Sequence, residues 1–465
     1  MLTTHGILIL RRLGMVIAAA MVVLAMAVPA HAASLTQAWA ERYVGGTDFQ
    51  YASSLAVSPD GSTVYVTGIS AGPEQQGDPY DVFATIAYNT SNGEMRWIDR
   101  YAFAHIDNWA STIVVTPNGQ RVFVTGATPA GYPIVAYDAS SGDRLWVKSV
   151  MPAGYTGFEG TLAVSPDSSR VYFSGEVEVG DGPGTKLLTR AYNTTTGAKA
   201  WGATLTPPAG TQVTPRAIAV DTAGQRLFVT GSMGTLDQVP SDNPPDFVTV
   251  GYGATTGAHL WTRTYDGANG ADYAQAVAVT PNGMHVIVAG TSGAANGTPR
   301  YGVLSYAAAT GTREWAVRSG SPSVGRSVGG MTLDQTGTMI YVTGSEFVAG
   351  SGESHYRTMA FSVANGARIW TKAFFGRDGG TADATAIGVS PTYLYVTGSA
   401  SDGTRDTYAT VAYLASTGQR VATAWYDGPD GVSAGPEAPG VGPGGVFVTG
   451  RGGGAYATVA YEFHL

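Results

Sequence analysis

The sequence IVAYDASSGDRLW, residues 134–146, decides the fold, because the rest of the chain repeats it together with its surroundings. An apolar strand ends in an aromatic residue, a polar turn carries Gly142, and Trp146 follows four residues after that glycine. The same order recurs at residues 88–97, 192–201, 252–261, 306–315 and 361–370, and a further copy at 413–422 ends in Ala422 instead of tryptophan. Repetition at a period of about 50 residues is typical of propellers and solenoids.

A second repeated segment gives the number of repeats. The sequence LAVSPDGSTVYVTG, residues 55–68, has the pattern of two strands joined by a tight turn, because Pro-Asp-Gly favours turns and the flanks are rich in β-branched residues. Its ending recurs eight times, at Gly68, Gly126, Gly175, Gly231, Gly290, Gly344, Gly398 and Gly450. Each repeat then holds four short strands, so we expect an all-β, eight-bladed propeller of four-stranded antiparallel blades.

The two ends of the chain are expected to complete one blade together. Residues 34–44 carry Trp39 and Tyr43 at the spacing of Trp97 and Tyr101, but the other strands of that repeat are missing nearby. The last repeat, by contrast, ends at its third strand, residues 457–461. Pairing of these two segments closes the ring and removes the exposed sheet edges that invite aggregation.

The repeated tryptophans are interpreted as packing residues between blades, since their regular recurrence suits a core and no single ligand site needs so many copies. They are Trp39, Trp97, Trp146, Trp201, Trp261, Trp315 and Trp370. The glycines that end the second strands are expected to permit a positive φ or a close neighbour. Trp109 lies outside the repeat position, in an expected blade-to-blade loop. Trp425, three residues past Ala422, is a candidate to fill the missing tryptophan's place.

The repeat resembles two known families of propeller. Ala136, Asp138, Ser141, Gly142 and Trp146 resemble the tryptophan-docking motif of the eight-bladed quinoprotein dehydrogenases, and the VYVTG strands are similar to the YVTN repeats of bacterial surface-layer propellers. Both resemblances imply the fold over essentially the whole mature chain. The first implies pyrroloquinoline quinone (PQQ) as a cofactor where the enzyme is active. No catalytic residue is carried over, because the vicinal Cys pair is missing and the Glu-Asn-Asp set is not matched.

Residues 1–32 have the pattern of a secretory signal peptide. Arg11 and Arg12 precede an apolar run at residues 15–28 that is too short to cross a bilayer comfortably, and Ala30-His31-Ala32 fits a cleavage site. The paired arginines leave general secretion and twin-arginine export both open. We therefore expect a signal peptide at 1–32 and one propeller domain at 33–465. The mature protein is expected to be secreted and monomeric, without a membrane span.

Composition excludes several kinds of partner and site. The whole chain has 26 basic and 34 acidic residues and a formal net charge of −8, and loss of Arg11 and Arg12 with the signal peptide lowers it to about −10. Nucleic acid needs a clustered basic footprint, which is absent. The chain has no cysteine, which excludes disulfides, thiolate metal sites and thiol nucleophiles.

One face of the ring is the expected binding surface. Because successive strands alternate in direction, the short first-to-second and third-to-fourth turns lie on one side of the disc, which we call the short-turn face. The variable second-to-third and blade-to-blade loops lie on the opposite side, which we call the loop face. Variable loops on a rigid scaffold often carry binding residues. The loop face is rich in acids, and the candidate ligand-binding residues are Glu74, Asp78, Asp81, Asp107, Asp242, Asp246, Asp272 and Asp383. Such a face attracts Ca²⁺ or a basic partner. The alternative is that these acids only keep the protein soluble.

The sequence contains few candidate catalytic residues. His105 and His355 fall in expected variable loops, where a shared metal or general-base site is one hypothesis and a structural role is the other. No zinc-protease, nucleophile-elbow or phosphate-loop motif is present. The sequence therefore predicts an exported, non-catalytic binding or scaffold propeller, for a protein, cell-wall or polysaccharide ligand. It predicts no required cofactor. A PQQ-like oxidoreductase or another metal-assisted enzyme is the alternative.

Overall fold

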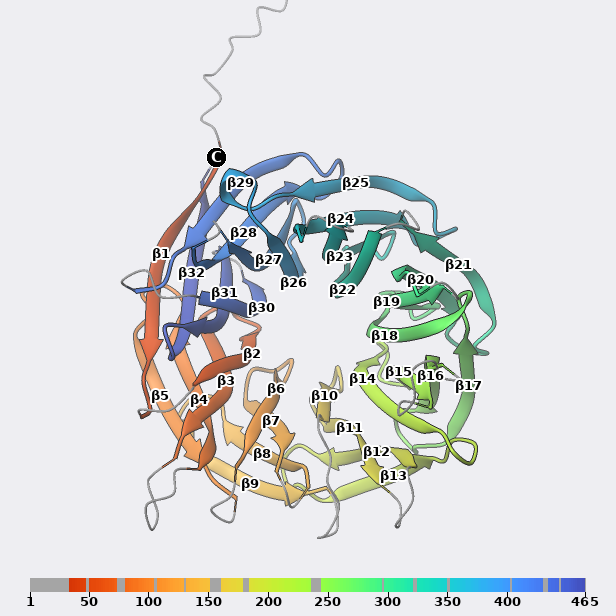
Figure 1. Ribbon diagram of the computed structural model, residues 1–465. Helices are drawn as coiled ribbons and strands as arrows, with labels where there is room; N and C mark the ends of the chain where they lie inside the picture. Colours follow the sequence, from red (N-terminus) through yellow and green to blue (C-terminus); the bar gives the residue numbers. More distant parts are fainter. Residues whose placement is uncertain are drawn as a thin grey trace, which may run out of the picture.

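The computed structural model describes residues 33–464 except 47–49, 73–79, 104–106, 129–130, 151–159, 179–183, 236–243, 295–296, 321–323, 349–351, 402–403, 430–433 and 443–444. The predicted signal peptide at 1–32 lies outside the described residues. The described residues form eight four-stranded antiparallel sheets, as predicted, and the sheets are arranged as blades around a central axis (Figure 1). Within the described part of the chain, no helix has the length and hydropathy of a membrane span.

Blade 1 is β2 (Tyr51–Val57), β3 (Thr63–Ala71), β4 (Asp81–Asn89) and β5 (Met95–Tyr101). Blade 2 is β6 (Trp109–Val115), β7 (Arg121–Ala127), β8 (Pro133–Asp138) and β9 (Arg144–Ser149). Blade 3 is β10 (Gly160–Val164), β11 (Arg170–Glu178), β12 (Thr185–Asn193) and β13 (Lys199–Leu205). Blade 4 is β14 (Gln212–Val220), β15 (Arg226–Gly234), β16 (Asp246–Gly253) and β17 (His259–Tyr265).

Blade 5 is β18 (Asn269–Val279), β19 (His285–Ala294), β20 (Arg300–Ala307) and β21 (Arg313–Ser319). Blade 6 is β22 (Val324–Leu333), β23 (Met339–Val348), β24 (Ser354–Ser362) and β25 (Arg368–Phe374). The short 3-10 helix η1 (Arg377–Gly379) precedes blade 7, which is β26 (Ala382–Val389), β27 (Tyr393–Ser401), β28 (Asp406–Leu414) and β29 (Arg420–Tyr426). Blade 8 is β30 (Ala434–Gly442), β31 (Gly445–Gly452), β32 (Tyr456–His464) and β1 (Ser34–Tyr43).

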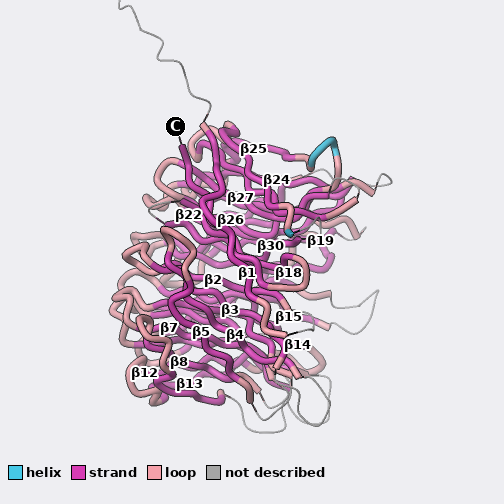
Figure 2. The backbone as a smooth tube through the Cα atoms, turned by 90° about the vertical axis from the view of Figure 1, so that its left-hand side faces the viewer, coloured by secondary structure: helices cyan, strands magenta, loops and turns pink. Residues whose placement is uncertain are grey.

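The ring closes as expected, through the N-terminal strand. β1 is the fourth strand of blade 8 and pairs antiparallel with β32, which sets Trp39 opposite Ala460 and Tyr43 opposite Tyr456. In every blade the first strand lies nearest the axis and the fourth strand lies at the rim (Figure 1). Figure 2 shows the disc from the side, with η1 on the loop face.

The repeated tryptophans pack each blade onto the next. The Trp97 indole lies against the turn of the following blade, where a β-carbon on Gly142 would come within 2.5 Å of its ring. Gly142 has a φ of 77°, so the turn itself also requires glycine. Each indole N–H donates to a carbonyl of that next turn: Trp39 to Thr90, Trp97 to Ala139, Trp146 to Thr194, Trp201 to Ala254, Trp261 to Ala308, Trp315 to Val363 and Trp370 to Ala415, at 2.8 to 3.1 Å.

Trp425 does not fill the place left by Ala422, so that expectation is wrong. Trp425 packs back on Phe374 of blade 6, at 5.9 Å between ring centroids, and joins the core of that neighbour. Ala422 instead faces the core of blade 8. Blade 8 has no continuous turn between its third and fourth strands, because the chain ends lie there. A docking tryptophan at position 422 would therefore have no glycine turn to cover.

The glycines that end the second strands are explained by close neighbours. In blade 2, a β-carbon on Gly126 would lie 2.0 Å from the carbonyl oxygen of Trp109. The cause is a β-bulge in the first strand, where the register shifts between Ala110 and Thr112. Among the described residues, seven of the eight blades bulge at this place, with Ser53, Ser111, Arg216, Gln275, Gly329, Thr385 and Glu437 as the inserted residues. A bulge re-aims a side chain, and these bulges form a ring on the strands nearest the axis.

Candidate functional site

The predicted acidic residues are distributed over the loop face. Three of them, Glu74, Asp78 and Asp242, lie outside the described residues, as does His105. The other five lie at or near strand ends that meet the loop face: Asp81, Asp107, Asp246, Asp272 and Asp383. Asp107 accepts the backbone N–H of Asp81 at 3.2 Å. Asp246 and Asp272 belong to a second, denser group.

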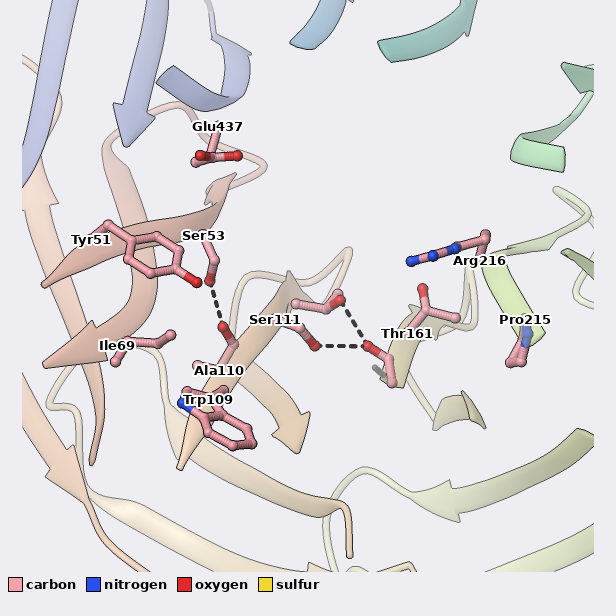
Figure 3. A pocket seen from close by; sticks show the side chains of 12 residues that line it. Tyr51, Ser53, Ile69, Trp109, Ala110, Ser111, Thr161, Pro215, Arg216 and Glu437 are labelled. Carbon is pink, nitrogen blue, oxygen red and sulfur yellow. Dashed lines mark hydrogen bonds between the residues drawn. The ribbon is translucent and has the colours of Figure 1, made fainter. Parts of the chain in front are cut away.

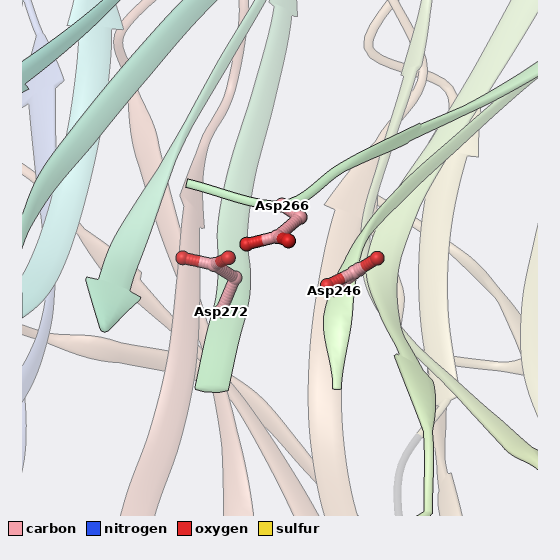
Figure 4. Close-up of side chains that lie close together, drawn as sticks. All are labelled: Asp246, Asp266 and Asp272. Atoms are coloured by element: carbon pink, nitrogen blue, oxygen red, sulfur yellow. The ribbon is translucent and has the colours of Figure 1, made fainter. Parts of the chain in front are cut away.

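Asp246, Asp266 and Asp272 come together between blades 4 and 5 (Figure 4). Asp246 begins β16, Asp266 follows β17 directly, and Asp272 lies in β18. One carboxylate oxygen of each residue lies within 4.8 Å of the others. Asp266 is exposed, Asp246 is half-buried and Asp272 is fully buried. The carboxylates therefore converge from three separate segments of backbone.

This crowding changes the protonation of the group. Burial raises the pKa of Asp246 to about 6, and the charges of Asp266 and Asp272 contribute to the rise. Burial also raises the pKa of Asp272, while the Gly267 amide and the neighbouring Ser292 side chain partly oppose this. Like charges held close together in a partly buried place disfavour ionisation. A bound cation would relieve that repulsion.

His355 does not lie in a variable loop, so that expectation is corrected. It lies in β24 and is buried, with its Nε2 3.3 Å from a carboxylate oxygen of Glu346. Arg326 and Arg357 contact the same carboxylate. This ion network holds the pKa of Glu346 at about 2, because the His355 and Arg357 hydrogen bonds and the two arginine charges outweigh the effect of burial. The arrangement is that of a structural ion cluster within blade 6.

The mouth of the central channel carries a second candidate site, which we call the mouth pocket. It has a volume of about 440 Å³ and is lined by Tyr51, Ser53, Ile69, Trp109, Ala110, Ser111, Thr112, Gly160, Thr161, Pro215, Arg216 and Glu437 (Figure 3). Tyr51 and Trp109 begin the first strands of blades 1 and 2, so the pocket opens toward the loop face. Trp109 was expected in a loop. It instead begins β6, with 42% of its side chain exposed.

The bulges supply the polar groups of the mouth pocket. The Ser53 hydroxyl donates to the Ala110 carbonyl at 2.6 Å and the Ser111 hydroxyl donates to the Gly160 carbonyl at 2.9 Å. These hydrogen bonds link adjacent blades around the channel. Arg216 and Glu437 project toward the opening from different sides (Figure 3). Burial raises the pKa of Glu437, and the charge of Arg451 opposes the rise.

Sequence reasoning missed three of these residues. Asp266 was overlooked because it follows a rim strand and nothing nearby in the sequence marks it as a neighbour of Asp246 and Asp272. Arg216 and Glu437 were overlooked because a bulge cannot be read from one repeat. The available signal was the shared position: Arg216 and Glu437 each directly follow the residue that pairs with the glycine ending the second strand, as Ser53 and Ser111 do.

Comparison with known proteins gives one family and a common fold. The sequence profile of the family described as outer membrane protein assembly factor BamB matches residues 32–236 and 185–434. No curated protein matches the sequence significantly. Among solved structures, the quinohemoprotein alcohol dehydrogenase of Comamonas testosteroni is 13% identical, with a TM-score of 0.57 over 92% of this chain and 76% of that chain.

Two further solved structures have the same fold. The quinohemoprotein alcohol dehydrogenase ADHIIG of Pseudomonas putida HK5 is 14% identical, with a TM-score of 0.52 over 92% of this chain and 76% of that chain. Chaetomium thermophilum Sqt1, bound to the N-terminus of the ribosomal protein L10, is 12% identical, with a TM-score of 0.57 over 91% of this chain and 98% of that chain. Enzymes and binding proteins share this architecture, so the fold alone does not assign an activity.

Proposed function

Since this chain belongs to the family described as outer membrane protein assembly factor BamB, we propose that it is an exported, non-catalytic binding scaffold. It holds a segment of a protein partner at the loop-face mouth of its central channel. Export is part of the proposal and rests on residues 1–32, which lie outside the described residues.

The observation that carries the proposal is the mouth pocket. Its volume of about 440 Å³ suits several side chains of a peptide. Trp109 and Tyr51 offer aromatic surface, and Trp109 is 42% exposed although apolar aromatic area is costly to leave in water. Arg216 and Glu437 supply one charge of each sign for the polar groups of a backbone or side chain. Such a mixture favours a peptide over a purely anionic or purely apolar ligand.

The charge of the loop face favours a partner with basic residues. The formal net charge of the chain is −8, and five described acids lie at the loop-face ends of the strands. A mouth with negative surroundings attracts cationic segments. The solved complex of Sqt1 with the N-terminus of ribosomal protein L10 supports the general idea that a protein of similar fold binds a segment of a protein partner.

The alternative is a PQQ-dependent oxidoreductase, as the resemblance to quinoprotein dehydrogenases implies. PQQ carries three carboxylates, so its site needs several cationic groups or free donors. Among the described residues that line the mouth pocket, Arg216 is the single cationic side chain and Glu437 adds an acid. The Ser53 and Ser111 hydroxyls already donate to backbone carbonyls. These residues do not fit the cofactor, and we derive no reaction from it.

A binding screen tests the proposal. The mature protein is applied to an array of peptides of matched length with basic, neutral and acidic compositions, and to a glycan array, at low and at physiological salt. We expect retention of basic peptides that weakens as salt rises. Trp109→Ala and Glu437→Gln should each reduce that binding at least tenfold. Met284→Ala, which removes an exposed apolar side chain from the short-turn face, should leave it unchanged.

Two results would contradict the proposal. Peptide binding that survives both mouth variants, or that Met284→Ala weakens equally, would move the site away from the mouth pocket. Incubation with PQQ and Ca²⁺, followed by desalting, gives the second test. Stoichiometric retention of the quinone absorbance would favour the oxidoreductase.

A further inference from the structure

In three blades, one position of the repeat holds the loop that enters the blade. In blades 1, 2 and 5, the residue before the aromatic of the first strand is polar and fully buried: Gln50, Asn108 and Asp272. Each accepts a hydrogen bond from a backbone N–H of the preceding loop: Gly45 to Gln50 at 2.6 Å, Phe103 to Asn108 at 3.0 Å and Gly267 to Asp272 at 2.7 Å. The shared role is to fix the blade-to-blade connection.

Asp272 departs from its two counterparts in its second polar atom. The Asn108 side-chain amide donates to the Asp81 carbonyl at 3.0 Å, and the Gln50 amide donates to the Gly46 carbonyl at 2.8 Å. Asp272 has an oxygen in place of that amide group. Its Oδ1 is buried and has no hydrogen-bond partner. A buried carboxylate oxygen without a donor costs free energy, unless a cation occupies the space beside it.

The surroundings of Asp272 supply further carboxylate oxygens, beside the Ser292 hydroxyl that lowers its pKa. Asp246 and Asp266 each bring a carboxylate oxygen within 4.8 Å of the Asp272 carboxylate (Figure 4). The Asp272 backbone N–H donates to the Pro245 carbonyl at 2.6 Å, which fixes β18 beside the start of β16. Arg318 is a nearby cation, but its hydrogen bonds go to Ser292 and Gly293. The three carboxylates thus share one space from three directions.

We propose that Asp246, Asp266 and Asp272 bind one Ca²⁺ ion, which clamps blade 4 to blade 5. Oxygens on opposite sides of Ca²⁺ lie about 4.6–5.2 Å apart, whereas around Mg²⁺ they lie about 4.2 Å apart. The three carboxylate oxygens all lie within 4.8 Å of one another, so one cation can contact them all. Carboxylates from three separate backbone segments suit the flexible coordination of Ca²⁺ better than the strict octahedron that Mg²⁺ requires. The three aspartates provide three or more of the six to eight ligands that Ca²⁺ takes, and water completes the shell. None of the three lines the mouth pocket, so this site is separate from the proposed peptide pocket.

The repeat itself provides the decisive variant. Asp272→Asn recreates the side chain that blade 2 carries at Asn108, so it keeps the acceptor for Gly267 and adds the missing donor. It also removes one of three crowded negative charges. The variant should therefore fold, and in EDTA it should melt at the same temperature as the wild type or higher. It should lose Ca²⁺ binding at the same time.

The experiment is calorimetric titration of the mature protein, freed of metal with EDTA and dialysed, first with Ca²⁺ and then with Mg²⁺. We expect one Ca²⁺ per chain, at least tenfold weaker binding of Mg²⁺, and a higher melting temperature with Ca²⁺. Asp272→Asn and Asp246→Asn should each weaken Ca²⁺ binding at least 100-fold and abolish the thermal shift. Asp383→Asn, a loop-face acid outside the cluster, should leave both unchanged.

Three results would overturn the proposal. They are no Ca²⁺ heat at millimolar concentration, wild-type Ca²⁺ binding by Asp272→Asn or Asp246→Asn, or tighter binding of Mg²⁺ than of Ca²⁺. An equal loss in Asp383→Asn would do the same, because it would mark diffuse attraction by the acidic face instead of a defined site.

Discussion

Removal of one docking tryptophan should destabilise the ring far more than removal of an exposed one. Trp261 is the most buried of the repeated set, with 4% of its side chain exposed, and lies between Phe228 and Tyr306 at 5.6 and 6.0 Å between ring centroids. Its Nε1 donates to the Ala308 carbonyl at 3.0 Å. Trp261→Ala therefore removes a large buried ring and leaves a carbonyl without its donor.

The magnitude follows from these two losses. Truncation of a buried Trp to Ala costs about 3–5 kcal/mol, and a lost hydrogen bond adds about 1 kcal/mol, so we expect a total of roughly 4–6 kcal/mol. Trp261→Phe keeps most of the ring contact and loses the hydrogen bond, so about 1–2 kcal/mol is expected. Trp109→Ala, at the exposed mouth, should cost less than about 1 kcal/mol.

Urea-induced unfolding followed by circular dichroism measures this order. The midpoint should fall strongly for Trp261→Ala, slightly for Trp261→Phe and least for Trp109→Ala. A companion variant, Ala422→Trp, should not raise the midpoint, because blade 8 offers no glycine turn for the added indole. A larger effect of Trp109→Ala than of Trp261→Ala would refute the assignment of docking positions.

Further predictions concern closure, the bulge and pH. Deletion of residues 34–44 removes β1 and exposes the edge of β32, so the truncated protein should melt lower and aggregate, whereas wild-type melting and monomeric elution would contradict this closure. Gly290→Ala places a β-carbon 2.1 Å from the Tyr273 carbonyl oxygen and should cost about 1–3 kcal/mol; an unchanged urea midpoint would argue against the bulge. Because the pKa of Asp246 is raised to about 6 from 3.8, its contribution to stability is present below pH 3.8 and is lost as pH rises through 6. In EDTA, the melting temperature of the wild type relative to Asp246→Asn should fall between pH 4 and pH 7, and parallel curves would contradict this. Glu346 has the opposite sign, since its pKa is lowered to about 2 from 4.5, so the stabilisation that Glu346→Gln removes should vanish as pH falls from 4.5 to 2.

The fold was predictable because the features that specify it are local and repeated. Gly142 and Trp146 lie four residues apart, and each copy of this spacing supplies both partners of the contact between blades. The glycine receives the tryptophan of the preceding blade, and the tryptophan packs on the glycine of the next. Closure followed from a count of strands, since Trp39 had no repeat around it. The same reasoning failed for Trp425. A missing tryptophan at position 422 does not tell whether the next blade has a glycine turn for a tryptophan to cover.

The sites were only partly predictable, for a physical reason that Asn108 and Asp272 illustrate. As loop-face acids, Asp272 and Asp383 look alike in the sequence, and both fit a solvating role. They separate only when each is placed at its position in the blade, where Asp272 occupies a site that blades 1 and 2 fill with an amide whose donor and acceptor are both used. A carboxylate in place of an amide keeps the shape and the accepting oxygen, but it replaces the NH₂ donor with a second, negatively charged acceptor oxygen. In a protein of repeats, therefore, the functional positions are better sought where one blade breaks the hydrogen-bond pattern of its neighbours than where charge is merely abundant.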